Sequence, residues 1–306
     1  MCVAMRISFL FLLLAFLGPL SPALAARGIG EKLHATKRCS QGGELEDKQK
    51  LADLVIRIYE REEFEDCVEV LRGNRLVYAG RADGRLGIGN DINKGADSET
   101  YHAPVIPIGT DITGLGEPDV ILNEWSGGAH CCFTFHVLEL SEHPREIAAI
   151  DAEDSDYAHF EDLKHDGAYE FVGRDFVFAY WNASFLQSPA PRIVLRFNGD
   201  RYELAPELMR QHAPSAEKLE ATEHEVRKAS WQNGSPPPLL WETMLDLIYT
   251  GHPELAQSFL DHAWIPAQPG KEVFQHNFCS KLVTSLYFRA LSLTMPNAPC
   301  APDPQK

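Results

Sequence analysis

The stretch DITGLGEPDVIL, residues 111–122, returns without gaps as DLKHDGAYEFVG, residues 162–173. Each copy begins with an aspartate, has a glycine five residues later and has an acidic residue eight positions after the first aspartate. A β-type run of residues follows in each copy, which is typical of a strand. The repeat therefore predicts two equivalent corners, each of which leads the chain into a β-sheet.

The residues around the repeat have the same character. Between residues 67 and 205, short runs such as VEVLR, RLVYA, PVIPI, FVFAYW and RIVLRF alternate with Gly, Pro, Asp or Asn. Gly73-Asn74 and Asn198-Gly199 are signals for tight hairpins. Because no helical stretch separates the runs, we expect an antiparallel unit of about ten strands rather than parallel βαβ units.

Helical patterns flank this unit. Within the segment 26–66, EDKQKLADLVIRIYEREEF has apolar residues three and four apart, which predicts an amphipathic helix. Further helices are predicted within 206–306, in PSAEKLEATEHEVRKASWQ, LLWETMLDLIY, PELAQSFLDHAW and KEVFQHNFCSKLVTSLYF, before a Pro-rich tail. The predicted fold class is mainly β with helical additions: a propeller-blade-like antiparallel unit, an N-terminal helix and a C-terminal helical subdomain. We expect the helices at both ends to cap the open edges of the sheets.

Residues 1–25 read as a signal peptide. A short apolar run, ISFLFLLLAFLG, is followed by small residues at Ala23 and Ala25. No later segment is apolar enough to span a membrane, so we expect an exported protein of the periplasm or the cell exterior. The formal net charge of −16 argues against nucleic acid and anionic membranes as partners.

Six cysteines follow the signal segment, and in an oxidising compartment they predict disulfides. If CCFTFHVLEL is a strand, Cys131 and Cys132 point to opposite faces and would take different partners; a bond between these neighbours is the alternative. Cys279 and Cys300 would tie the C-terminal tail to the last helix. The candidates are Cys39, Cys67, Cys131, Cys132, Cys279 and Cys300.

The repeated loop, followed by PDVILNEW, the turn SGGAH and FTFHVLEL, resembles FG-GAP/VCBS-type repeats of integrin α-subunit-like β-propellers. More narrowly, SGGAHCCFTFHV looks like a stretch of uncharacterised exported bacterial proteins. The resemblance covers residues 105–200 best. It implies a blade-like fold, a role in interaction and a calcium site formed by loop positions one, three, five and nine.

Both copies depart from that calcium pattern. The first copy has Asp111, Thr113 and Asp119 but has Leu115 at position five, which leaves few oxygens for a hard dication. The second copy has the three carboxylates of Asp162, Asp166 and Glu170, with Lys164 among them. Calcium is possible in this loop, but we favour neutralisation by the Lys164 ammonium, which would make the loop a structural corner.

Three other groups of residues suggest chemistry. His130, Cys131, Cys132 and His136 have donors for zinc or copper, although disulfides with ordinary histidines are favoured. FAYWNASF (178–185) and Trp125 offer aromatic side chains for contact with a sugar or a peptide. Finally, His159, Asp162, His165 and Asp166 lie close together in HFEDLKHD and suggest metal-assisted hydrolysis.

The sequence favours a non-enzymatic binding or scaffold protein with a protein or glycan partner, because the resemblance is to interaction modules. The alternative is the metal-assisted hydrolase. A deep pocket lined by the histidines and aspartates would favour the enzyme, and a shallow aromatic surface would favour the binding protein.

Overall fold

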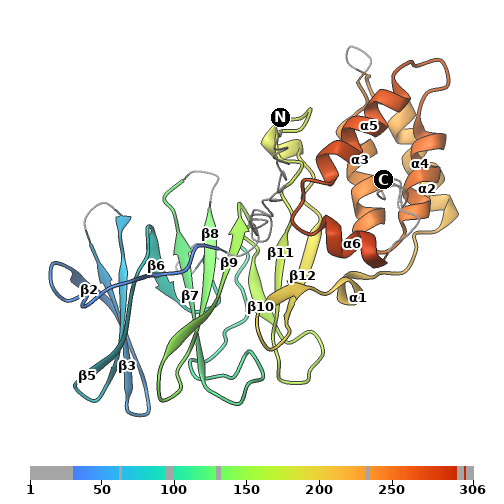
Figure 1. Cartoon of the computed structure of the whole chain (residues 1–306). Coiled ribbons are helices and arrows are strands. Elements are labelled where there is room, and N and C mark those ends of the chain that lie inside the picture. Colours follow the sequence, from blue (N-terminus) through green and yellow to red (C-terminus); the bar gives the residue numbers. More distant parts are fainter. Residues whose placement is uncertain are drawn as a thin grey trace, which may run out of the picture.

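Three antiparallel sheets lie side by side, and most of the helices gather at one end of the third sheet (Figure 1). The computed structural model describes residues 30–61, 64–93, 100–128, 132–231, 235–294 and 300. Strands β4 to β13 lie between Cys67 and residue 205, where a β-rich unit was predicted, but β1 to β3 precede Cys67 and belong to the first sheet as well. The first sheet has the order β1(His34–Ala35), β5(Arg75–Arg81), β4(Cys67–Arg72), β3(Leu54–Glu60) and β2(Glu44–Leu51).

The other two sheets follow in chain order. The middle sheet contains β6(Arg85–Ile88), β7(Asp119–Trp125), β8(Phe133–Glu139) and β9(Arg145–Glu153), paired in that order. The third contains β10(His159–Glu161), β11(Glu170–Arg174), β12(Arg192–Phe197) and β13(Tyr202–Leu204). Each pairing is antiparallel, so the architecture is mainly β with added helices.

The prediction of an N-terminal helix is wrong. The stretch forms β2 and β3, which pair as a hairpin around Ala52 and Asp53. Leu54, Ile56 and Ile58 are fully or almost fully buried and alternate with more exposed residues, which is the period of a strand. Since Leu54 and Ile58 also satisfy a helical spacing of four, the pattern did not distinguish the two structures.

Two of the expected strands are also absent. Residues 104–108, PVIPI, run without regular structure, and two of these five residues are prolines, which have no N–H for a ladder. Residues 176–181, FVFAYW, form turns, and Tyr180 has a positive φ of 57°. The aromatic side chains there pack on helices instead: Trp181 meets Trp241 edge to face at 5.3 Å.

The middle sheet is buried on both faces. One face packs on the first sheet around Ile56 and Ile58, and the other packs on the third sheet around Phe160 and Phe171. Residues of β7 and β8 alternate between these two cores, as a pleated strand requires. Val120, Leu122 and Leu138 enter the first core, and Ile121, Phe135 and Val137 enter the second.

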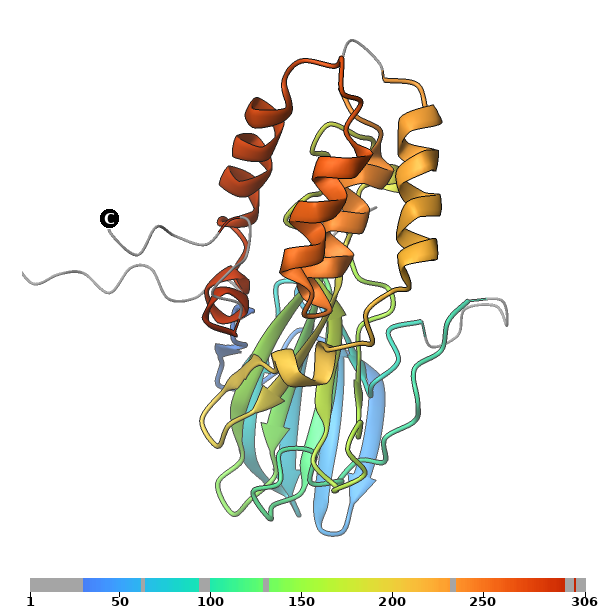
Figure 2. The same cartoon turned by 90° about the vertical axis from the view of Figure 1, so that its right-hand side faces the viewer.

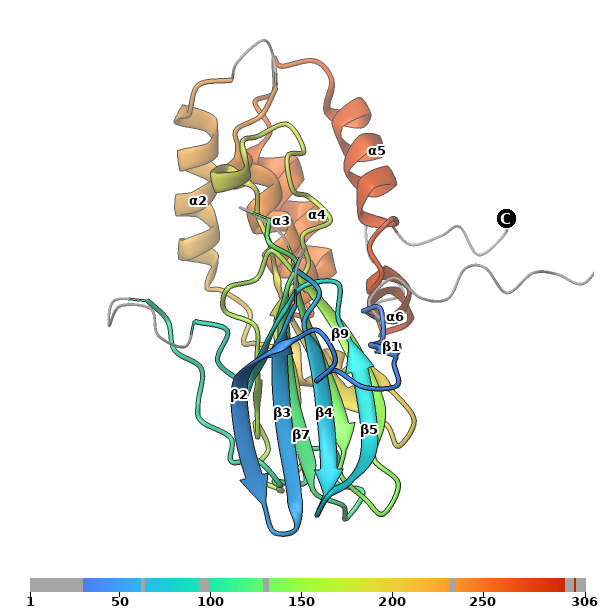
Figure 3. The same ribbon diagram turned by 90° about the vertical axis from the view of Figure 1, so that its left-hand side faces the viewer.

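The helices are α1(Pro206–Met209), α2(Ala216–Lys228), α3(Pro238–Tyr249), α4(Pro253–Ala263), α5(Lys271–Leu282) and α6(Phe288–Thr294). The C-terminal helical patterns are thus confirmed. Helices α2 to α5 stand beyond the ends of the strands (Figures 2 and 3), and their apolar residues continue the core of the third sheet.

In the described part of the chain no helix covers the first sheet, so the expected capping of both ends by helices is wrong at this end. Its edge strand β2 is instead rich in charged side chains and mostly exposed, which discourages pairing with other chains.

Two disulfides join described cysteines. Cys39–Cys67 ties the N-terminal segment to the start of β4, and Cys279–Cys300 holds the C-terminal tail on α5, as expected. Cys132 is disulfide-bonded as well, whereas Cys131 and His130 lie outside the described residues. None of the helices in the described part of the chain has both the length and the apolar character needed to cross a bilayer.

Candidate functional site

The two repeated loops share one pattern of hydrogen bonds. The Asp111 carboxylate accepts the backbone N–H groups of Gly114, Leu115 and Gly116 at 2.7–3.1 Å. In the second copy, Asp162 accepts those of Asp166 and Gly167, both at 3.1 Å. Gly116 and Gly167 have φ of 88° and 87°, the left-handed region that glycine enters without steric cost. Each loop leads into a strand, β7 or β11.

The acidic residue at the start of each strand accepts hydrogen bonds from the beginning of the preceding loop. Asp119 accepts from the N–H groups of Ile112 and Thr113 and from the Thr113 hydroxyl. Glu170 accepts from the Leu163 N–H, at the position equivalent to Ile112. The two corners also touch, because the Tyr169 N–H donates to the Ile112 carbonyl at 2.9 Å.

These carboxylates are therefore engaged with the protein itself. Lys164 pairs with Asp166, as proposed from the sequence, but both side chains are 43% exposed. The buried Glu170 is paired with Arg196 of β12 instead, at 3.2 Å. Across the described residues, no group of three or more His, Cys, Asp or Glu side chains is placed to hold a metal ion. The calcium site stays a prediction. The hydrogen bonds and ion pairs of the two loops favour the interpretation of the loops as structural corners.

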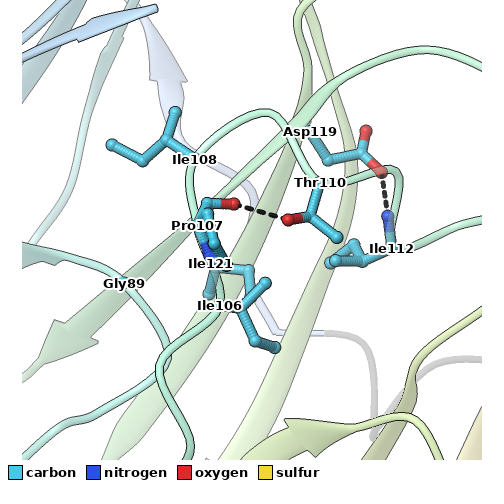
Figure 4. A pocket seen from close by; sticks show the side chains of 8 residues that line it. All are labelled: Gly89, Ile106, Pro107, Ile108, Thr110, Ile112, Asp119 and Ile121. Carbon is cyan, nitrogen blue, oxygen red and sulfur yellow. Dashed lines mark hydrogen bonds between the residues drawn. The ribbon is translucent and has the colours of Figure 1, made fainter. Parts of the chain in front are cut away.

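One oxygen of Asp119 differs from the rest. Its Oδ2 is bonded to the loop, whereas its buried Oδ1 has no partner among the described residues. Asp119 lines a small cavity between the strands and the 106–112 segment, with Ile106, Ile108 and Thr110 nearby (Figure 4). The cavity has a volume of about 10 Å³, close to the smallest space that holds one water molecule.

We expect the Asp119→Asn variant to be more stable than wild type at pH 7, and by a larger margin than at pH 4. Burial raises the pKa of Asp119 to about 6, against the bonds from Thr113 and Ile112 that lower it. Because the folded-state pKa lies above the ordinary 3.8, the stability due to protonation is complete below pH 3.8 and is lost as the pH rises through about 6. The asparagine oxygen keeps the loop bonds without the charge. At about 1.4 kcal/mol per pKa unit, the gain at pH 7 is on the order of 1–3 kcal/mol.

Thermal unfolding at pH 4 and pH 7 measures this gain. Asp111→Asn is the matched control, since Asp111 occupies the outer side of the same loop. A variant whose stability relative to wild type is the same at both pH values would show that Asp119 is not the titrating group.

The four residues proposed for metal-assisted hydrolysis lie at opposite ends of strand β10. His159 opens this strand and is buried, whereas Asp162, His165 and Asp166 lie beyond its other end. His165 is exposed and has a φ of 57°. His159 lines a pocket whose lining residues do not include Asp162, His165 or Asp166, so that pocket does not bring these sequence neighbours together.

That pocket lies where the β9–β10 turn meets the start of β10, the end of β11 and the start of β12, and its volume is about 180 Å³. Asn90 and Asn93 fix the segment that brings Tyr101 there. Asn90 bonds to both the N–H and the carbonyl of Phe160, and Asn93 donates to the carbonyls of Tyr101 and Asp156. The lining residues are Tyr101, Ser155, Tyr157, His159, Val172, Gly173, Arg174 and Arg192.

Two arginines dominate the charge of this pocket. Arg174 on β11 and Arg192 on β12 are directly paired across the sheet, an arrangement of like charges that costs free energy. Arg174 donates to the Ala190 carbonyl at 2.8 Å, and neither guanidinium forms a salt bridge with a described carboxylate. Both arginines are exposed, and the partial burial of Arg192 lowers its pKa, while the charge of Glu161 opposes that shift.

The other polar groups surround the arginines. His159 Nδ1 lies 2.7 Å from the Tyr157 carbonyl, and its Nε2 lies 3.3 Å from Glu161 Oε2. The Tyr101 hydroxyl lies over the same imidazole, 3.3 Å from Nε2. Ser155 is 1% exposed, and its hydroxyl has no hydrogen-bond partner in the described part of the chain. Among the described residues, no hydrogen bond joins Ser155 to His159.

Sequence reasoning identified His159 but missed the rest of the pocket. The two arginines stand at the ends of YEFVGR and RIVLRF, and their pairing depends on a register across the long 175–191 connection. Only a correct strand register would have revealed it.

The other sequence candidates are distributed elsewhere. His136 is fully buried with Glu124 and Glu146 on its two ring nitrogens, so it has no free donor for a metal. In the aromatic stretch, Phe178 and Trp181 pack on helices, while Tyr180 is 63% exposed. Trp125 is 38% exposed and meets Phe64 edge to face.

Comparison with known proteins gives little further information. No family model matches the sequence, and no solved structure is significantly similar to it. A stretch of 124 residues is 29% identical to the uncharacterised protein y4bJ of Sinorhizobium fredii. The match covers 40% of this chain and 19% of that protein, so the chain spans only a small part of the relative.

Proposed function

We propose that the chain is an exported, non-enzymatic binding protein that captures an anionic group between Arg174 and Arg192. The observation that carries the proposal is the cross-strand arginine pair, which lines an open pocket and has no acidic partner in direct contact among the described residues. An anion held there would remove the repulsion between the guanidinium groups and accept their N–H donors. The buried Ser155 hydroxyl adds a further unused hydrogen-bonding group.

Other features support the wider setting of this proposal. The apolar run before Ala25 and the disulfides suit export. We further propose that the sheets are propeller blades related to FG-GAP/VCBS-type repeats, in which the two aspartate corners serve as structural turns. Three sheets leave two open sides, and we infer that the protein acts through a partner, a glycan or another protein, rather than as an enzyme.

Arg192→Gln tests the site. At low ionic strength, D-galacturonate, acetate and phosphate are compared by the rise in melting temperature, because a ligand that binds only the folded state stabilises it. We expect wild type to respond to at least one of these anions and Arg192→Gln not to respond. Without ligand, the variant should be as stable as wild type or more stable by up to about 1 kcal/mol, because the like-charge pair is gone.

The control is Arg201→Gln, which removes a charge from the exposed β12–β13 turn, where Arg201 is 60% exposed. It should keep the full response. An equal response of wild type and Arg192→Gln to every anion would exclude the arginine pair as the binding site.

A further inference from the structure

We infer that the pocket on the third sheet recognises a uronic acid, that is, a sugar ring bearing a carboxylate. The inference rests on the proposed anion-binding function and names its ligand class. Three features of the pocket support it, namely the planar donors, the unused hydroxyl and an exposed aromatic ring.

The donors suit a carboxylate. Two arginines present flat guanidinium groups from adjacent strands, and this group matches the two oxygens of a carboxylate. Nearby acidic residues limit the net positive charge: Glu161 acts on Arg192, and Asp156 and Asp246 interact with Arg174. A single negative charge therefore fits the local balance better than a dianion such as phosphate.

The remaining polar groups suit sugar hydroxyls. Ser155 is buried with an unpartnered hydroxyl, and the Tyr101 hydroxyl lies beside His159. Each can donate to or accept from a ligand hydroxyl. A simple carboxylate such as acetate would leave the Ser155 hydroxyl buried without a partner.

An aromatic wall completes the site. Tyr157 is 49% exposed, lies 5.3 Å from the Tyr101 ring between centroids, and has the Arg174 guanidinium 5.9 Å above its ring. The apolar face of a pyranose can rest on such a ring while its carboxylate meets the arginines. The cavity of about 180 Å³ is large enough for one sugar ring, and the exposure of Tyr157 leaves it open for the rest of a glycan.

Isothermal titration calorimetry of the full chain with D-galacturonate, D-glucuronate, methyl galactoside, acetate and phosphate tests the inference. We expect at least one uronate to bind about tenfold or more tightly than acetate and phosphate, which corresponds to about 1.4 kcal/mol. Methyl galactoside, which lacks the carboxylate, should not bind measurably. Digalacturonate would bind more tightly than the monosaccharide if a chain end is the natural ligand, and equally if a free sugar is.

Two variants separate ring recognition from charge recognition. Tyr157→Ala should weaken uronate binding about tenfold and acetate binding by much less, because the sugar uses the aromatic ring directly whereas acetate depends on it only through the contact of Tyr157 with Arg174. Ser155→Ala should act in the same direction. Equal affinity for uronates and acetate would overturn the uronate inference but leave the anion site standing. The absence of binding by every anion would overturn both.

Discussion

His136→Ala is expected to lower the free energy of unfolding by about 3–5 kcal/mol at pH 6, since removing one member of a buried ionic group leaves the others uncompensated. His136 lies on β8, facing the first sheet, and is fully buried. Its Nε2 is 2.9 Å from Glu124 and its Nδ1 is 2.8 Å from Glu146. Glu146 also accepts the Leu33 N–H, so the imidazole links β7 to β9 within the middle sheet and, through Glu146, is connected to the N-terminal segment.

The effect should depend on pH. Burial by itself lowers the pKa of His136, but the hydrogen bonds and charges of Glu124 and Glu146 outweigh it and raise the pKa above the ordinary 6.5. A raised histidine pKa contributes stability that is complete below pH 6.5 and is lost as the pH rises through the folded-state value. The cost of His136→Ala should therefore be larger at pH 6 than at pH 9, as measured by urea unfolding.

Two controls distinguish charge from packing. His143→Ala, at an exposed position, should change stability by less than about 0.5 kcal/mol. In a Glu124→Gln, Glu146→Gln background, the cost of removing the imidazole should fall, because the two carboxylates no longer repel each other. If the cost stays the same in both backgrounds, the cavity and not the charge explains it.

Local signals predicted much of the β region. The hairpins at Gly73-Asn74 and Asn198-Gly199 join β4 to β5 and β12 to β13, because such turns are decided by a few adjacent residues. The aspartate corners are local in the same way: Asp111 binds N–H groups three to five residues ahead. Gly251 and Pro253 at the turn between α3 and α4 predicted the helical hairpin.

The features that the sequence did not predict depend on contacts between distant residues. The turn at Ala52, with a φ of 51°, carries no glycine or proline, so nothing divided the supposed helix into β2 and β3. The charge partner of Glu170 is Arg196, 26 residues away, rather than the adjacent Lys164. The arginine pair of the pocket likewise depends on strand register, which a single sequence does not specify.

Asp175→Ala is expected to cost about 3–5 kcal/mol and to loosen the helices from the third sheet, because hydrogen bonds to buried charged groups contribute about 1.5–3 kcal/mol each. Asp175 follows β11 and is 2% exposed. Its Oδ2 accepts the hydroxyls of Tyr249 on α3 and Ser285 after α5, and its Oδ1 accepts the Val177 N–H. One carboxylate thus joins the sheet to two parts of the helical subdomain.

Tyr249→Phe and Asp175→Asn are the matched variants. Tyr249→Phe removes one of the three bonds and should cost about 1–2 kcal/mol, and Asp175→Asn keeps an acceptor oxygen and should fall between the two. Amide hydrogen exchange locates the effect: Asp175→Ala should speed exchange in α3 and α5 more than in β7 and β8, because the lost bonds hold the helices and not the middle sheet. Uniform acceleration across the chain would mean that the helices and the sheets unfold as one cooperative unit, and that Asp175 is not a separable junction between them.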